Sequence, residues 1–148
     1  MKVAIVMAGV LLAISNPARL PAQAAPVSEL QKVVEDYVRL YTGPTLGEWR
    51  SLFHPAMIAV HPAEGGSIRV RNFDEFFGAQ KRAFAAGSKM SERLENVRIE
   101  PGRRMARVSA DFIFTDDEKP HRGKLGLHLA QGSEGWKIVA VIFSYDQP

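Results

Sequence analysis

The stretch that decides the fold is residues 105–145, MARVSADFIFTDDEKPHRGKLGLHLAQGSEGWKIVAVIFSY. Apolar side chains fall on alternate positions in 105–115 and again in 123–131. A period of two is typical of a strand that buries one face. The run 136–145 is apolar at both parities, so we expect this strand to be central in the sheet or covered on both sides. Polar turns separate the three runs, which predicts an antiparallel meander.

Upstream of this stretch, the hydrophobic period changes to that of helices. Apolar residues recur at i, i+3 and i+4, the spacing of one buried helical face, in three segments: 28–41, 45–53 and 72–86. Asn72 followed by Glu75 is a capping-box signature and marks the start of the third segment. Three shorter runs predict further strands: 57–61, 67–70 and 93–100.

This order of elements predicts an α+β fold, in which three N-terminal helices pack on one strongly bent antiparallel sheet. A bent sheet wrapped around helices has the shape of a cone, and a cone that narrows at one end leaves a cavity at the other. We therefore expect a pocket between the helices and the sheet.

Residues 1–24 have the pattern of a signal peptide. Lys2 provides a positive charge, an apolar run follows it, and the segment ends in Ala22-Gln23-Ala24, the small-x-small pattern that signal peptidase cleaves. We expect cleavage between Ala24 and Ala25, a mature domain of residues 25–148, and a periplasmic or secreted location. The apolar run is too short to span a bilayer, so no membrane association is expected after cleavage.

Charge and cysteine content argue against several classes of function. The sequence has no cysteine, which removes disulfides, iron–sulfur clusters and thiolate chemistry. Without Lys2 and Arg19, the mature domain carries 17 basic and 16 acidic residues, so its charge indicates no nucleic-acid partner. No two histidines have the i, i+2 or i, i+4 spacing of metal ligands, and no nucleotide-binding motif is present. We therefore expect no metal and no cofactor.

Three motifs carry a resemblance to a known fold: Tyr37-Val38-Arg39-Leu40-Tyr41, Trp49 with Leu52-Phe53-His54-Pro55, and Gly135-Trp136-Lys137-Ile138-Val139 with Phe143-Ser144-Tyr145. In their order and spacing, the chain resembles the nuclear transport factor 2-like superfamily, in its branch of SnoaL-like and lumazine-binding domains. The likeness covers residues 28–145. It implies a cone-shaped pocket and, commonly, a homodimer formed through the outer face of the sheet. Relatives include isomerases, dehydratases, cyclases, epoxide hydrolases and non-catalytic binding domains, so the resemblance does not assign a function.

The third predicted helix has an amide within an aromatic stripe. A buried amide without a partner costs about 1–3 kcal/mol, so Gln80 requires a hydrogen bond from the backbone, from water or from a ligand, unless it lies at the edge of the stripe. The predicted pocket wall consists of this amide and seven aromatic residues: Tyr37, Tyr41, Trp49, Phe53, Phe73, Phe77, Gln80 and Phe84.

Three side chains are candidates for acid–base chemistry. His61 ends a predicted strand near the expected opening, and histidine has the ordinary pKa closest to neutrality. His128 and Asp111 oppose their apolar neighbours in parity, but parity does not show which face of the sheet they occupy. Each also has a plainer interpretation: a surface turn for His61, an exposed or interface position for His128, and an ion pair with Lys124 or Arg107 for Asp111.

If Asp111 faced the pocket, the likeness to ketosteroid isomerase-like relatives would imply a general base, with Tyr37 or Tyr41 stabilising the oxyanion. No motif carries these roles over residue by residue, so the pair is a hypothesis only.

The sequence leaves three functions open. The preferred hypothesis is an exported binding domain for a small apolar or aromatic molecule, oriented by Gln80 and His61. The first alternative is a cofactor-free acid–base enzyme, namely an isomerase, dehydratase or hydrolase, which requires an inward-facing carboxylate or histidine. The second alternative is a dimeric association module without a ligand.

Overall fold

The computed structural model describes residues 26–146, and the predicted signal peptide lies outside them. The helices are α1 (Val27–Arg39), α2 (Leu46–Ser51) and α3 (Phe73–Ala85), with a single 3-10 turn, η1 (Glu64–Gly66). The strands are β1 (Phe53–Pro62), β2 (Ile68–Asn72), β3 (Met90–Pro101), β4 (Met105–Asp116), β5 (Lys119–Gly132) and β6 (Gly135–Tyr145). The fold is α+β, as the sequence predicts.

The six strands form one mixed sheet in the order β2-β1-β6-β5-β4-β3. Neighbouring strands are antiparallel except for β1 and β6, which run parallel. The prediction of a wholly antiparallel sheet was therefore wrong at this pair. The parallel pairing places β6 between β1 and β5, which confirms that the strand apolar on both faces is central.

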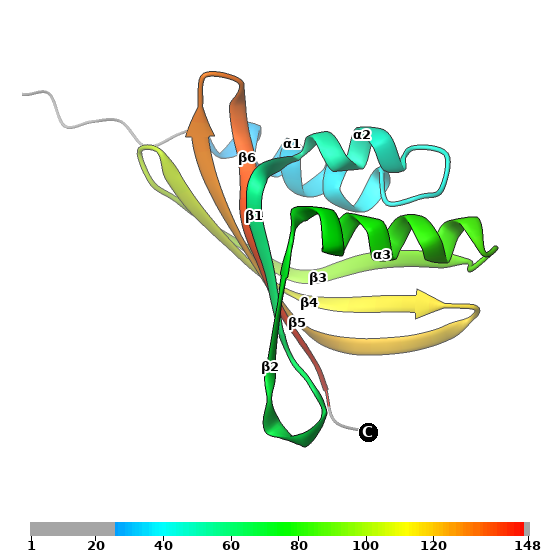
Figure 1. Cartoon of the computed structure of the whole chain (residues 1–148). Helices are drawn as coiled ribbons and strands as arrows, with labels where there is room; N and C mark the ends of the chain where they lie inside the picture. Colours follow the sequence, from blue (N-terminus) through cyan, green and yellow to red (C-terminus); the bar gives the residue numbers. More distant parts are fainter. Residues whose placement is uncertain (1–25, 147–148) are drawn as a thin grey trace, which may run out of the picture.

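The helices lie on one side of the bent sheet (Figure 1). Two of them, α1 and α2, precede β1, whereas α3 connects β2 to β3, so the description of three N-terminal helices does not match the chain order. The predicted capping box of α3 is confirmed: the Glu75 amide donates to the Asn72 side chain, and the Asn72 amide donates to the Glu75 carboxylate, both at 3.0 Å. Within residues 26–146, no helix combines the length and apolar character needed to cross a membrane.

The hydrophobic core lies between the helices and the inner face of the sheet. Its largest fully buried side chains come from all layers of the fold: Leu30, Trp49, Met57, Val108, Leu127, Leu129, Ile138 and Val141. The Trp49 indole nitrogen donates a hydrogen bond to the Tyr37 carbonyl oxygen at 2.9 Å, so α2 is connected to α1 inside this core.

A β-bulge interrupts β3. Glu95 pairs with Asp111 and Arg98 pairs with Ser109, so two residues of β3 oppose one residue of β4. Asn96, in the bulge, has a φ of 52°, in the left-handed region. The extra residue reverses which alternate side chains of the strand face inward. Leu94 and Ile99 both face inward, although in a regular strand residues five positions apart lie on opposite faces. The bulge therefore decides which side chains at the start of β3 point toward the helices.

Candidate functional site

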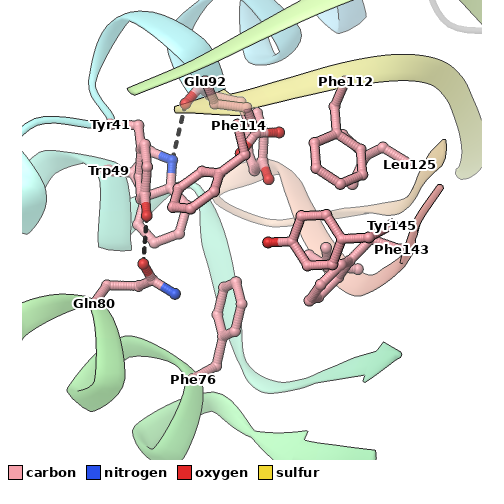
Figure 2. Close-up of a pocket in the computed structure, with 12 residues that line it drawn as sticks. Tyr41, Trp49, Phe76, Gln80, Glu92, Phe112, Phe114, Leu125, Phe143 and Tyr145 are labelled. Atoms are coloured by element: carbon pink, nitrogen blue, oxygen red, sulfur yellow. Dashed lines mark hydrogen bonds between the residues drawn. The ribbon is translucent and has the colours of Figure 1, made fainter. Parts of the chain in front are cut away.

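A cavity of about 70 Å³ lies between the helices and the inner face of the sheet (Figure 2). Five residues from the α1–α2 region and α3 line it: Tyr37, Tyr41, Trp49, Phe76 and Gln80. Seven residues from β3, β4, β5 and β6 complete the wall: Glu92, Phe112, Phe114, Leu125, Val141, Phe143 and Tyr145. The wall is aromatic and aliphatic except for one carboxyl group, one amide and the tyrosine hydroxyls.

Four of the eight predicted wall residues line this cavity, namely Tyr37, Tyr41, Trp49 and Gln80. The other four lie elsewhere. Phe53 packs in the core with its ring 4.6 Å from that of Trp49, and Phe84 packs edge-on against Tyr41 at 5.5 Å.

Phe73 and Phe77 stack on each other next to Arg50, whose guanidinium carbon lies 4.7 and 4.9 Å from the two ring centres. On α3 the cavity is instead lined by Phe76 and Gln80, which are one helical turn apart.

The amide of Gln80 has a partner within the protein. The Tyr41 hydroxyl donates a hydrogen bond to its side-chain oxygen (Figure 2), and the same hydroxyl lies 3.8 Å from the Met90 sulfur. The amide oxygen is thus bonded to another side chain. Because Tyr41 and Gln80 both line the cavity, this bond forms part of its wall.

Glu92 is the carboxylate of the cavity, and it is not among the site residues predicted from the sequence. It lies on β3 opposite Phe114 and is partly buried. Burial raises the pKa of Glu92 to about 7, while hydrogen bonding with Tyr37 acts in the opposite direction. A carboxyl group that titrates near neutrality is suited both to accept and to release a proton.

Two features of β3 explain why Glu92 was missed. The predicted strand began at Arg93, whereas the observed strand begins at Met90. In addition, a regular alternation counted back from Ile99 places Glu95 inside and Glu92 outside, and only the bulge at Asn96 reverses this assignment. The alternation of Glu92 with Leu94 was a usable signal, but nothing in the sequence shows where parity changes.

Three tyrosines bring hydroxyl groups to the cavity. Burial raises the pKa of Tyr37, Tyr41 and Tyr145, and the nearby Glu92 charge raises each of them further. All three phenols therefore stay protonated near neutral pH and remain available as hydrogen-bond donors. The hydroxyl of Tyr145 points into the cavity (Figure 2).

The three residues named as acid–base candidates lie outside the lining. The His61 ring stacks on Phe143 at 4.8 Å, and its Nδ1 lies 2.8 Å from the Pro62 carbonyl oxygen, so it sits behind the wall. His128 pairs with Arg107 and Ala140 and opposes the buried Leu127 and Leu129, which places it on the outer face of the sheet.

Asp111 also lies on the outer face. It accepts hydrogen bonds from Lys124 Nζ at 2.5 Å and from Asn96 Nδ2 at 2.6 Å. The hydrogen bond from Lys124, followed by that from Asn96, lowers the pKa of Asp111 below its ordinary value. The plainer interpretation of Asp111, an ion pair with Lys124, is the arrangement observed. Among the described residues, no group of three or more histidine, aspartate or glutamate side chains is arranged to hold a metal ion.

The family assignment agrees with this fold. The SnoaL-like domain matches residues 30–147, so the chain belongs to the SnoaL-like family, within the nuclear transport factor 2-like superfamily. No functionally curated protein matches the sequence.

Solved structures with low sequence identity share the fold. A proposed dehydratase of the nuclear transport factor 2-like family from Streptomyces avermitilis has a TM-score of 0.68 and 14% identity, over 82% of this chain and 96% of that chain. A proposed scytalone dehydratase from Novosphingobium aromaticivorans has a TM-score of 0.65 and 12% identity, over 82% and 84%. Bd1075 of Bdellovibrio bacteriovorus has a TM-score of 0.67 and 12% identity, over 81% of this chain but 40% of its own length. At such identities the likeness shows the fold alone.

Proposed function

We propose that this protein is an acid–base enzyme in which Glu92 transfers a proton to or from a small, mainly apolar molecule held in the aromatic cavity. The observation that carries the proposal is the position of Glu92, a carboxyl group in a wall made otherwise of aromatic and aliphatic side chains, phenols and the Gln80 amide. Isomerisation and dehydration of a carbonyl compound are the reaction classes that fit, because each can begin with the removal of a proton from the carbon next to the carbonyl group. Two proteins of similar fold are proposed dehydratases, which supports this choice.

The chemistry assigns one role to each polar group. The Glu92 carboxylate takes the α-proton of a carbonyl substrate, and the electrons of the C–H bond form the double bond of an enolate. The Tyr145 hydroxyl, which points into the cavity, donates a hydrogen bond to the enolate oxygen. The protonated Glu92 then returns the proton to another carbon in an isomerisation, or to a departing hydroxyl group, which leaves as water, in a dehydration.

The remaining polar groups position the reacting ones. The hydrogen bond from Tyr41 to Gln80 connects the chain after α1 to α3 and so keeps both side chains in the wall. Hydrogen bonding with Tyr37 favours the ionised form of the Glu92 carboxyl group, which acts against the effect of burial on its pKa. No part of this mechanism uses His61, His128 or Asp111.

The test does not require the natural substrate. In D2O, a general base in the cavity exchanges the α-protons of small ketones for deuterium, which NMR measures directly for acetone, hydroxyacetone and cyclobutanone. We expect the purified protein to accelerate this exchange, and Glu92→Gln to lose about 10²- to 10⁴-fold of the acceleration, the usual contribution of a general base.

Two matched variants serve as controls. Glu95→Gln changes a carboxylate of the same strand that pairs with Arg93 at 2.9 Å and Arg122 at 3.7 Å. Asp111→Asn changes the ion-paired carboxylate on the outer face. Both should retain full exchange activity. If the wild-type protein does not accelerate exchange, or if Glu92→Gln retains it, the acid–base function is wrong.

The second candidate function is binding of a small apolar or aromatic molecule without chemistry. The predominance of rings over polar groups in the wall favours it. Its test is the binding of phenol, followed through chemical-shift changes of the Trp49 indole group. Phenol binding that survives Glu92→Gln, combined with no proton exchange, would support a binding domain.

We also propose export and self-association. The N-terminal pattern supports export, and sequencing the N-terminus of the chain recovered from its cells should find Ala25 first.

Three exposed apolar side chains lie together on the outer face of the sheet: Ile58, Val70 and Ile142. They are neighbours because β1 pairs with both β2 and β6 in this region. This apolar surface supports a homodimer. Analytical ultracentrifugation of the wild type and of Ile142→Lys tests it: a dimer that the substitution dissociates is the expected result.

A further inference from the structure

The cavity has an excess of negative charge that no lining residue compensates. Glu92 is the charged residue of its wall, and the wall contains no lysine, arginine or histidine. The ion pairs found within residues 26–146 do not include Glu92. The ionised Glu92 carboxylate therefore lacks a protein counter-ion in this part of the chain.

A second carboxyl group adds to this charge. Asp116 ends β4, pairs with Met90, and faces inward on the same side as Phe114. Its Oδ1 is buried and has no hydrogen-bond partner. The charge of Asp116 contributes to the raised pKa values of both Tyr41 and Tyr145, so it acts on the same phenols as Glu92.

One basic residue that does not line the cavity influences a tyrosine of its wall. The positive charge of Arg71, on β2, lowers the pKa of Tyr145, but the combined effect of burial, Glu92 and Asp116 in the opposite direction is larger. Tyr145 is 47% exposed, so the influence of Arg71 falls at the open side of the site.

The rings of the wall also favour positive charge. The face of an aromatic ring carries negative potential and attracts cations that approach within about 6 Å of its centre. Tyr41 has its ring centre 5.0 Å from that of Trp49 and 6.4 Å from that of Phe114, and its ring plane is inclined by 52° to the first and by 53° to the second. Several aromatic faces around one space are an arrangement by which proteins hold alkylammonium groups, and a carboxylate in the same wall adds a negative charge.

We propose that the molecule held in this cavity carries a positively charged nitrogen, which the aromatic faces surround and for which Glu92 is the counter-ion. This inference rests on the proposal that the Glu92 cavity is the functional site, and it adds the charge of the ligand. The cavity volume of about 70 Å³ suits a short alkylammonium head group. The rest of the molecule would extend past Tyr145, where the site is open.

The experiment compares two molecules of one shape and different charge. Tert-butylammonium chloride and tert-butanol are titrated into the purified protein at constant chloride concentration, and their dissociation constants are measured from chemical-shift changes of the Trp49 indole group. We expect the ammonium ion to bind at least about tenfold more tightly than the alcohol. Glu92→Gln should reduce this preference to about twofold or less, and Glu95→Gln should leave it unchanged.

A second variant tests the aromatic contribution. Phe114→Leu removes one ring from the wall and keeps an apolar side chain, so it should weaken binding of the ammonium ion by about three- to tenfold and change the affinity for the alcohol little. This variant keeps the test informative if Glu92→Gln disturbs folding, which the urea midpoint of each variant would show.

Several results would overturn the inference: equal or tighter binding of tert-butanol, no binding of either compound, or a preference for the ammonium ion that persists in both variants. These results are distinct from failure of the proposed enzyme. A Glu92-dependent preference for the cation without proton exchange would contradict the acid–base function and support the positive charge of the ligand. Proton exchange without that preference would support the acid–base function and contradict the positive charge of the ligand.

Discussion

The hydroxyl of Tyr41 donates a hydrogen bond to the side-chain oxygen of Gln80, and this bond joins the segment after α1 to α3 across 39 positions of sequence. It gives a partly buried amide the partner that its burial requires. Since both residues also line the cavity, the bond contributes to stability and to the shape of the site at once.

A double-mutant cycle should detect this bond. Tyr41→Phe and Gln80→Leu should each reduce the free energy of unfolding by about 1–2 kcal/mol, and the double variant should lose about 0.5–1.5 kcal/mol less than the sum. Urea unfolding measures all four proteins. Tyr41→Phe combined with Gln31→Leu, a change at an exposed position of α1, should be additive. Additivity in the Tyr41 and Gln80 cycle would contradict the assigned bond.

Stability should fall as pH rises through the titration range of Glu92. Its pKa is about 7 in the folded protein, compared with an ordinary value of 4.5. Between these values the unfolded chain has released the proton that the folded chain retains, so ionisation favours unfolding. The loss begins above about pH 4.5 and levels off above about pH 7, at about 3 kcal/mol.

Glu92→Gln isolates this effect from the other titrating groups. The unfolding free energy of the variant, minus that of the wild type, should increase by about 3 kcal/mol between about pH 4.5 and about pH 8. Urea unfolding at the two pH values provides the measurement. A difference that does not change with pH would show that Glu92 titrates normally in the folded protein.

The bulge in β3 should depend on Asn96. Its φ of 52° is accessible to asparagine and glycine but unfavourable for β-branched side chains. Asn96→Val should destabilise the protein by about 1–2 kcal/mol, and Asn96→Gly should cost clearly less, although both variants lose the hydrogen bond to Asp111. Urea unfolding compares them. NMR titration of Glu92 in each variant then shows whether the carboxyl group keeps its raised pKa, and equal stability of the two would contradict the requirement for a left-handed residue.

Gly123 should tolerate no side chain, because β4 and β6 approach it closely. It pairs with Phe112 and with Tyr145, and a Cβ atom at this position would collide with the Ser144 carbonyl oxygen and lie 2.5 Å from Phe112 Cε1. Gly123→Ala should therefore cost more than about 2 kcal/mol and displace Phe112 from the cavity wall.

Gly126→Ala is the matched control on the same strand. The nearest atom to its Cβ is the Ile142 carbonyl oxygen at 3.7 Å, an ordinary contact, so the change should be within about 1 kcal/mol. Denaturant unfolding of both variants provides the comparison. Equal losses would indicate that the collision at Gly123 is relieved by small shifts.

The sequence by itself determined the α+β class, the capping box at Asn72, the central position of 136–145 and the superfamily. The first three are encoded locally, since hydrophobic period and cap chemistry depend on residues within a few positions of one another. The superfamily follows instead from a resemblance in the order and spacing of motifs over residues 28–145. The same periodicity brought Tyr37, Tyr41, Trp49 and Gln80 to attention, although the choice among the phenylalanines of α3 required knowing which helical face meets the sheet.

Only the tertiary structure decided the parallel pairing of β1 with β6, the outer position of Asp111 and His128, and the place of Glu92 in the cavity. Alternation along a strand shows that two sets of side chains face opposite ways, but strand pairing chooses which set meets the helices. A single extra residue at Asn96 reversed that choice for the start of β3. The raised pKa of Glu92 follows from burial by segments far apart in the chain, which no local pattern records.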